Sequence, residues 1–253
     1  MMLLQIIFVG TAGSGKTSLT NKFGTWVESN TGNSVSFVNL DPGCTNLPYK
    51  CDFDIRQYFT IEEIMKKETL GPSGAMLKGA ELTENMMGHI IEKIDQLDKQ
   101  YVLIDTPGQS EIFVFQSAGP AICDQLKKSS QTICVYIIDG LIARTGTNLA
   151  SSISLSLATQ MRLGIPIVNV LNKSDLSNNN EIFRMLSDYD YMKKIIEKEE
   201  SGTMKGLSLK FVDAAKMLSS SQRVVQVSSL TGEGMSQLLD LVQESTCECG
   251  DLS

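Results

Sequence analysis

The chain has 253 residues, of which 42% are hydrophobic and 20% charged, with 22 Lys and Arg against 29 Asp and Glu. This length and composition suit a folded domain with a full core and argue against disorder. The net charge of −7 argues against duplex nucleic acid as the main partner, because phosphate binding needs clustered basic side chains. A nucleotide in a locally basic pocket remains compatible with it. No apolar run approaches the roughly 18 residues that span a bilayer, so no membrane association is expected.

Short apolar runs rich in β-branched residues alternate with segments of helical length. The runs, interpreted as strands, cover residues 4–10, 35–41, 101–105, 132–139, 166–172 and 223–228. The clearest helices between them are expected at residues 17–30, 82–98, 148–163 and 235–245. Several runs are apolar on both faces, which is typical of parallel strands covered by helices. The sequence therefore predicts an α/β fold, with a doubly wound, mostly parallel sheet and helices on both faces.

Two stretches interrupt this alternation. Residues 44–80 are rich in Pro, Gly and aromatic side chains, and residues 177–222 are charged and resemble extra helices. We expect both to be insertions at one edge of the sheet, within a single domain that spans residues 1–253. Separate domains are not indicated.

The first residues and the cysteines bear on the compartment. The apolar start lacks a basic leader and a small-residue cleavage site, so a buried strand is favoured over a signal peptide. Cys123 and Cys134 stand in apolar surroundings, as reduced core residues do, and the cytoplasm is the expected compartment. Cys247 and Cys249 could bind a soft metal, but two thiols do not make a site.

The first chemical motif lies at residues 10–17, where GTAGSGKT fits G-x-x-x-x-G-K-[ST] at every fixed position. Its glycines let backbone N–H groups face a polyphosphate, and the following helix adds the positive end of its dipole. Lys16 would reach the β- and γ-phosphates, and Thr17 would ligate Mg²⁺. The alternative is a flexible Gly/Ser turn that happens to contain a lysine. The residues expected to bind the nucleotide in this phosphate-binding loop (P-loop) are Gly13, Ser14, Gly15, Lys16, Thr17 and Ser18.

The second motif is DTPGQ at residues 105–109, directly after an apolar strand. Asp105 would stand at the carboxyl end of that strand, where it can hold Mg²⁺ through water. Gly108 allows close approach of the backbone to a γ-phosphate, and Gln109 can orient water for in-line attack. Alone, such a segment is usually a strand-end turn. Beside a P-loop it indicates nucleotide hydrolysis.

The third motif, NKSD at residues 172–175, indicates the base. Asp175 can accept hydrogen bonds from guanine N1–H and the 2-amino group together, whereas adenine offers no such pair of donors. Asn172 would brace the pocket, and the aliphatic stem of Lys173 would cover the base. The alternative is a strand-end turn that caps a helix. Downstream, a segment that contains Ser228, Ser229 and Leu230 is similar to the fifth loop of GTPases. The alternative interpretation of this segment is a plain Ser/Gly loop that caps the last helix.

With these motifs in order, the chain resembles the GPN-loop GTPases over nearly its whole length. The resemblance also rests on NLDPG at residues 39–43, on Pro-Tyr at 48–49, on Asp-Ile-Arg at 54–56 and on DTPGQSE at 105–111. The segment TLGPSGA at residues 69–75 takes the place of the name-giving Gly-Pro-Asn loop. Two positions depart from the family pattern: Ser73 replaces the Asn, and Gly43 stands where Ala is usual.

The resemblance implies a P-loop GTPase that converts GTP to GDP and phosphate with Mg²⁺. It implies that Asp41 and Gln109 position the attacking water beside Lys16, and that Thr17 and Asp105 serve the metal. It also implies a homodimer whose subunit arrangement follows the nucleotide state. In that dimer the loop of Gly71, Pro72 and Ser73 would reach the partner's site. A helix-stop turn is the alternative for this loop.

The biological role is less determined by the motifs. Eukaryotic relatives in the resembled family are linked to assembly of RNA polymerase, so a polymerase assembly intermediate is one candidate client, and a molecular switch or assembly factor is one candidate role. A ParA/MinD-like dimeric ATPase is an alternative, although its extra P-loop lysine would stand at Thr11. A P-loop kinase is a further alternative, and it would need a basic substrate groove.

Overall fold

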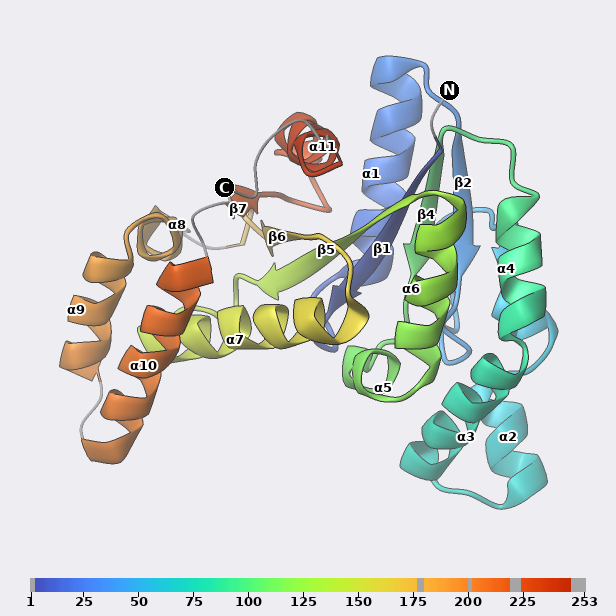
Figure 1. Cartoon of the computed structure of the whole chain (residues 1–253), viewed down its shortest axis with the longest axis horizontal. Helices are drawn as coiled ribbons and strands as arrows, with labels where there is room; N and C mark the ends of the chain where they lie inside the picture. Colours follow the sequence, from blue (N-terminus) through green and yellow to red (C-terminus); the bar gives the residue numbers. More distant parts are fainter. Residues whose placement is uncertain (1–2, 177–179, 200–201, 219–223, 247–253) are drawn as a thin grey trace.

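The computed structural model describes residues 3–176, 180–199, 202–218 and 224–246. Within these residues, seven strands form one sheet in which all neighbouring strands are parallel. Their order across the sheet is β3-β2-β4-β1-β5-β6-β7 (Figure 1). The strands are β1 (Leu4–Gly10), β2 (Val35–Asn39), β3 (Phe53–Asp54), β4 (Tyr101–Asp105), β5 (Gln131–Asp139), β6 (Ile167–Asn172) and β7 (Val224–Gln226). The predicted parallel sheet is confirmed.

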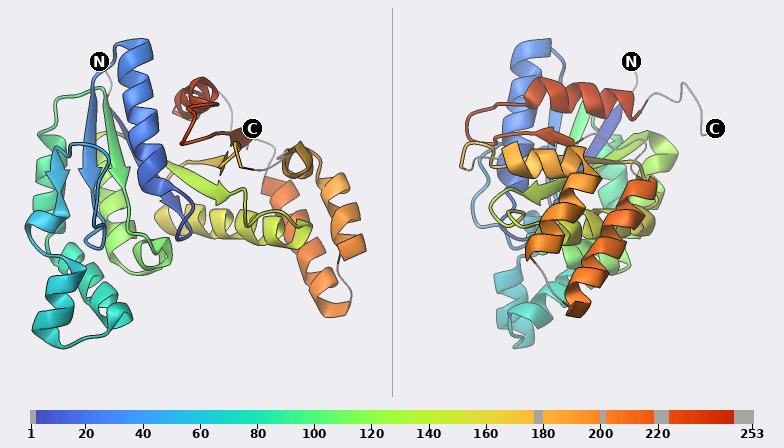
Figure 2. Two further views of the ribbon diagram at one scale, coloured as in Figure 1. Left: turned by 180° about the vertical axis from the view of Figure 1, so that it is seen from behind. Right: turned by 90° about the vertical axis from the view of Figure 1, so that its left-hand side faces the viewer.

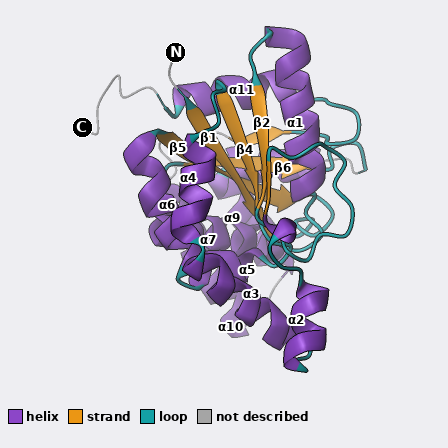
Figure 3. Cartoon of the chain, turned by 90° about the vertical axis from the view of Figure 1, so that its right-hand side faces the viewer, coloured by secondary structure: helices purple, strands orange, loops and turns teal. Residues whose placement is uncertain are grey.

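Helices cover both faces of this sheet, as predicted. Figure 3 shows α1 on one side of the strands and α4, α6 and α7 on the other. The described helices are α1 (Lys16–Thr31), the 3₁₀ turn η1 (Ile55–Gln57), α2 (Ile61–Glu68), α3 (Pro72–Asn85), α4 (Met87–Asp95), α5 (Ser110–Phe115), α6 (Ala118–Ser129), α7 (Gly146–Leu163), α8 (Asn180–Ser187), α9 (Tyr189–Glu199), α10 (Gly202–Leu218) and α11 (Met235–Glu244).

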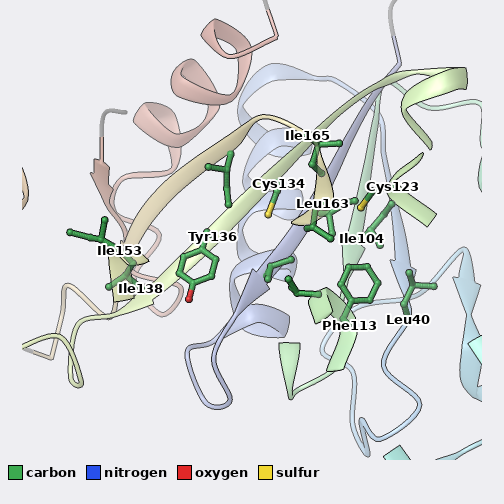
Figure 4. Close-up of a cluster of buried hydrophobic side chains, with 14 of the residues drawn as sticks. Leu40, Ile104, Phe113, Cys123, Cys134, Tyr136, Ile138, Ile153, Leu163 and Ile165 are labelled. Atoms are coloured by element: carbon green, nitrogen blue, oxygen red, sulfur yellow. The ribbon is translucent and has the colours of Figure 1, made fainter. Parts of the chain in front are cut away.

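The central strands are apolar throughout because both of their faces are buried. In β1, Ile7 and Val9 join the core under α4–α7, whereas Ile6 and Phe8 join the core under α1 and α11. All four side chains are fully buried. Figure 4 shows part of the first core, where Cys134 and Tyr136 of β5 lie near the labelled side chains of the covering helices. This arrangement is what a continuous apolar run at the centre of a doubly wound sheet requires.

The two interrupting stretches lie at opposite ends of the sheet, so the expectation of one shared edge was wrong. The first supplies β3 beside β2, together with α2 and the start of α3, which pack against each other. The second supplies α8, α9 and α10 beside β7 and α7 (Figure 2). Strand β3 was not predicted, because two residues in a polar segment carry no periodic signal. The helix expected at 82–98 is instead the end of α3 and the separate helix α4, with a break at Met86.

Strand register brings the polar strand ends to one edge. Asn39 of β2 is level with Asp105 of β4, and Asp139 of β5 is level with Asn172 of β6. Strand β1 ends between them at Gly10, where the P-loop begins. Ligands of doubly wound sheets bind in the crevice at this carboxyl edge, next to the point where the strand order reverses.

Cys247 and Cys249, considered above as a possible metal pair, lie outside the described residues.

Candidate nucleotide site

The P-loop joins β1 to α1 through two left-handed glycines. Gly13 has φ +76° and Gly15 has φ +94°, a backbone region that favours glycine. The first loop-to-helix bond runs from the Leu19 N–H to the Gly15 carbonyl. The N–H groups of Lys16, Thr17 and Ser18, in the first turn of α1, therefore have no partner within the helix. A phosphate group is a natural partner for such a turn.

Lys16 is buried, and its ammonium is surrounded by carbonyl oxygens. Its Nζ donates to the carbonyls of Gly10 at 2.7 Å, Thr11 at 3.1 Å and Gly108 at 2.8 Å. Burial lowers the pKa of Lys16, while the nearby charges of Asp105 and Asp41 oppose that effect. The first two contacts lie within the P-loop, and the third links it to the DTPGQ segment, 92 residues away. They hold a positive charge at the crevice, where a polyphosphate would neutralise it.

Asp105 is fully buried at the end of β4. Its Oδ2 accepts a hydrogen bond from the Tyr49 hydroxyl at 3.0 Å, whereas its Oδ1 is buried without a partner. Burial raises the pKa of Asp105 to about 6, and the nearby hydroxyls of Thr17 and Tyr49 oppose that rise. A buried carboxylate with one unpartnered oxygen beside a hydroxyl is a donor set that suits a hard divalent cation.

Asp41 and Gln109 meet this site from two loops. Asp41 accepts hydrogen bonds from the Gly43 N–H at 2.8 Å and the Gly108 N–H at 3.0 Å. Burial raises the pKa of Asp41, and those N–H groups together with Lys16 oppose the rise. Gln109 is exposed and immediately precedes α5. Both side chains line a cavity of about 200 Å³, which also touches Ala12 of the P-loop and apolar residues of α2 and α3.

The loop that carries Asp41 is held by a polar network. Arg56 makes a two-point ion pair with Asp54 and donates to the Cys44 carbonyl at 2.9 Å. Asn39 donates to Asp54 at 2.9 Å and accepts from the Asp41 N–H at 3.0 Å. The pKa of Asp54 is lowered, because its hydrogen bonds to Arg56 and Asn39 outweigh partial burial. Residues 39–41 and 54–56 therefore act as one anchor for the loop.

The NKSD segment and the 228–230 loop meet at the other side of the P-loop. The Asn172 amide donates to the Ser14 carbonyl at 2.8 Å and accepts from the Ser229 N–H at 3.2 Å. Lys173 Nζ donates to the Gly13 carbonyl at 2.8 Å. A Cβ at Gly15 would stand 2.5 Å from the Asn172 amide nitrogen, so this contact requires glycine.

Asp175 lies at the rim of the same crevice. It is exposed, and its Oδ1 accepts a hydrogen bond from the buried Ser228 hydroxyl at 2.5 Å. The Ser228 oxygen in turn accepts from the N–H groups of Leu230 and Thr231, at 3.3 and 3.0 Å. The Leu230 side chain is exposed. The free oxygen of Asp175 is thus held beside a loop of fixed shape.

The Gly71-Pro72-Ser73 segment does not join this cluster. Thr69 ends α2 in the left-handed conformation, Gly71 precedes α3, and Pro72 is its first residue. Proline therefore starts a helix here, and glycine is not the residue that stops the preceding one. All three residues of the segment are exposed. The turn lies at the outer tip of the α2–α3 hairpin, away from the sheet (Figure 1).

Comparison with known proteins shows which family this chain belongs to. A family model described as a conserved hypothetical ATP binding protein matches residues 8–248. The GPN-loop GTPase PAB0955 of Pyrococcus abyssi is 37% identical over 254 residues, covering 98% of this chain and 99% of that protein. The chain belongs to the GPN-loop GTPase family. The GPN-loop GTPase 1 of Schizosaccharomyces pombe is 30% identical, covering 96% of this chain and 69% of the relative.

A solved structure shows the same family likeness in three dimensions. The apo form of the Pyrococcus abyssi GTPase PAB0955 matches with a TM-score of 0.87 and 35% identity, covering 97% of this chain and 98% of that one. Both the recognised family and the enzyme class of this GPN-loop GTPase, predicted from its motifs, are confirmed. Across the described residues, no helix has the length and apolarity that a membrane span requires.

Two contacts of the site are not predicted by the sequence motifs. Tyr49 belongs to the family pattern, but the pattern does not predict its hydrogen bond to Asp105. Asp139 pairs with Lys173 at 2.7 Å and was not singled out. Its signal was available, because it ends an apolar strand with an aspartate just as Asp105 does.

Proposed function

We propose that this GPN-loop GTPase binds GTP with Mg²⁺ in the crevice at the carboxyl edge of the sheet and hydrolyses it to GDP and phosphate. The observation that carries the proposal is the Asn172 amide, which bridges the P-loop and the 228–230 loop. Through it, a phosphate-binding element and a base-binding element share one rigid crevice. A nucleotide is the ligand that has both parts.

Guanine suits this crevice better than adenine, although the matching family model carries an ATP-binding description. Asp175 keeps one carboxylate oxygen beyond the one that Ser228 holds. Guanine N1–H and its 2-amino group can both donate to such a carboxylate. Adenine has no N1–H and no 2-amino group, so the aspartate would lose its partners on binding it. The 228–230 loop lies beside this carboxylate, because its Ser228 hydroxyl donates to Asp175.

The residues around Asp105 fit a divalent cation held together with the nucleotide. No three acidic, histidine or cysteine side chains converge in the part of the chain that is described, so a cage made of protein alone is not available there. The Thr17 hydroxyl and the Asp105 carboxylate would hold Mg²⁺ together with phosphate oxygens, as is usual for this ion. When bound, Mg²⁺ neutralises charge on the phosphates. The unpartnered Oδ1 of Asp105 supports this assignment.

Hydrolysis needs a water molecule aligned with the γ-phosphate. The Asp41 carboxylate, held by the Gly43 and Gly108 N–H groups, can accept a proton of that water. The Gln109 amide on the adjacent turn can orient it. Lys16 counters the charge that develops on the phosphate oxygens. These roles use charge and position, which is how phosphoryl transfer is accelerated.

We further propose that the chain works as one GTPase domain in a homodimer whose subunit arrangement follows the nucleotide. The support is the Gly71-Pro72-Ser73 turn, which is exposed and is stiffened by Pro72. This turn is not part of the phosphate site of its own chain described above. Two-fold symmetry would bring each turn to the partner's site. The free thiols of Cys44, Cys51, Cys123 and Cys134 support a cytoplasmic location.

A protein client, such as a polymerase assembly intermediate, is the partner that the family suggests for a switch or assembly factor. The two competing activities have less support from this chain. Thr11 supplies no charge where a ParA/MinD-like ATPase would have its additional lysine. The net charge of −7 gives no general basis for the basic substrate groove of a P-loop kinase.

The decisive test is the base preference. In Asp175→Asn the amide can pair with the xanthine base instead of guanine, so GTP affinity should fall by about 100-fold or more and xanthosine triphosphate should gain. Competition against a fluorescent guanine nucleotide measures this. Asp98→Asn, at an exposed loop position, is the matched control and should bind GTP as the wild type does. Equal competition by ATP and GTP in the wild type would contradict the proposed function.

A further inference from the structure

Asp139 ties the end of β5 to the base-binding segment. It is 6% exposed and stands level with Asn172 across the strand pair. Its Oδ2 lies 2.7 Å from Lys173 Nζ, and its Oδ1 accepts a hydrogen bond from the Leu141 N–H at 2.8 Å. The Gly140 N–H donates to the Asn172 carbonyl at 3.1 Å. The turn after β5 is therefore bonded to the turn after β6 through both backbone and side chain.

The turn after β5 holds the Lys173 side chain in place. Its backbone is left-handed, with φ +64°, which is uncommon for a residue with a Cβ. Its side chain reaches across the crevice, where Nζ also donates to the Gly13 carbonyl of the P-loop at 2.8 Å. The four-carbon stem thus spans the space between the base-side loop and the phosphate-side loop. It is fixed at its far end by Asp139 and by Gly13.

We propose that Asp139 is a positioning residue for nucleotide binding, because its carboxylate holds the Lys173 side chain stretched across the crevice. This inference rests on the proposed guanine-nucleotide site. Lysine has many rotamers, and an unpaired ammonium is drawn to water and to the charged phosphates. Pairing with a buried carboxylate removes that freedom before the nucleotide arrives. The ordered stem is then available as a flat apolar cover for the base.

A purely local role for Asp139 makes a different prediction. Its backbone carbonyl accepts hydrogen bonds from the Ile142 and Ala143 N–H groups, and its Oδ1 accepts from Leu141, so the residue also shapes its own turn. Asparagine keeps the backbone bonds and the side-chain acceptor but removes the negative charge that faces Lys173. Asp139→Asn therefore separates the hold on Lys173 from the shape of the turn.

The experiment measures equilibrium affinity and dissociation rate with fluorescent GDP and GTP on the full chain. For Asp139→Asn we expect both affinities to fall by the same factor, about tenfold, mainly through faster dissociation. The preference for GDP over inosine diphosphate should stay unchanged, since Asp175 is intact. Asp124→Asn breaks an exposed ion pair with Lys127 on α6, far from the site in the fold, and this control variant should bind both nucleotides normally.

A double-mutant cycle with Lys173→Met completes the test, because methionine keeps most of the stem and removes the ammonium. Lys173→Met should lose at least the same factor, and adding Asp139→Asn should cause no further loss. The Lys173→Met result also probes the contact should Asp139→Asn fail to fold, as monitored by its thermal melting curve. Unchanged GDP binding in a folded Asp139→Asn variant, or losses that add in the double variant, would overturn the inference while leaving guanine-nucleotide binding by the wild type intact. Absence of that wild-type binding would overturn the proposed function itself.

Discussion

Replacing Asp105 by asparagine should make the nucleotide-free protein more stable while it removes the cation site. Asp105 is fully buried, and only one of its two carboxylate oxygens has a partner. The charged form is thus costly in the empty site. Asparagine has the same shape, carries no charge, and still offers an oxygen to the Tyr49 hydroxyl. The free energy of unfolding of the nucleotide-free variant should therefore be higher than that of the wild type.

The magnitude follows from the raised pKa of Asp105. Burial moves this pKa from 3.8 to about 6, a difference of about two units that corresponds to about 3 kcal/mol. Because the folded-state pKa lies above the unfolded one, the folded protein keeps its proton longer as pH rises. Folding stability from this group therefore falls between about pH 4 and pH 6 and stays lower above that range. An unpartnered amide N–H₂ in the variant costs about 1 kcal/mol. The net gain at pH 7.5 should be about 2 kcal/mol, or roughly 4–8 °C in Tm.

Thermal and urea unfolding in EDTA without nucleotide measures this gain. The variant should be more stable than the wild type at pH 7.5, and the difference should vanish or reverse near pH 4, where the wild-type carboxyl is protonated. Asp98→Asn, an exposed carboxylate in the loop before β4, is the control and should show no comparable gain. A variant no more stable than the wild type at pH 7.5, or one stabilised equally at both pH values, would refute the reasoning.

Three further outcomes are expected. Lys16→Ala should abolish nucleotide binding or nearly so, measured by calorimetry, because the phosphates lose their buried counter-charge; retention of micromolar affinity would contradict this role. Gln109→Ala should bind GTP normally and lower kcat, whereas a raised KM with unchanged kcat would show that Gln109 acts on substrate binding. In the loop, Ser73→Ala should change turnover little, while Gly71→Val combined with Pro72→Ala should reduce turnover more than affinity. The assay measures phosphate release over a dilution series, with light scattering to report the oligomeric state. A constant specific activity in samples that are monomeric would disprove a site shared between subunits.

The sequence determined the elements whose chemistry is contiguous. The P-loop could be located because the four fixed positions of its eight-residue motif impose one backbone path, with Gly13 and Gly15 in the left-handed region. The NKSD segment was equally legible, since it follows an apolar strand and lies within four residues. Six of the seven strands in the described residues could be found from their apolar runs, and the remaining one, β3, is too short to show a period. Local backbone geometry and burial can be predicted from the sequence because they depend on residues that are close together in the chain.

Contacts between distant segments were decided only by the tertiary structure. Tyr49 meets Asp105 across 56 positions of the chain, and Lys173 meets Asp139 across 34. These pairings depend on the order of the strands and on where each strand ends. The sequence of an apolar run does not indicate which strand lies beside it. For the same reason, only the sheet order revealed that the two interrupting stretches lie at opposite ends. Hydrophobic pattern says which residues are buried, but it does not say which neighbour buries them.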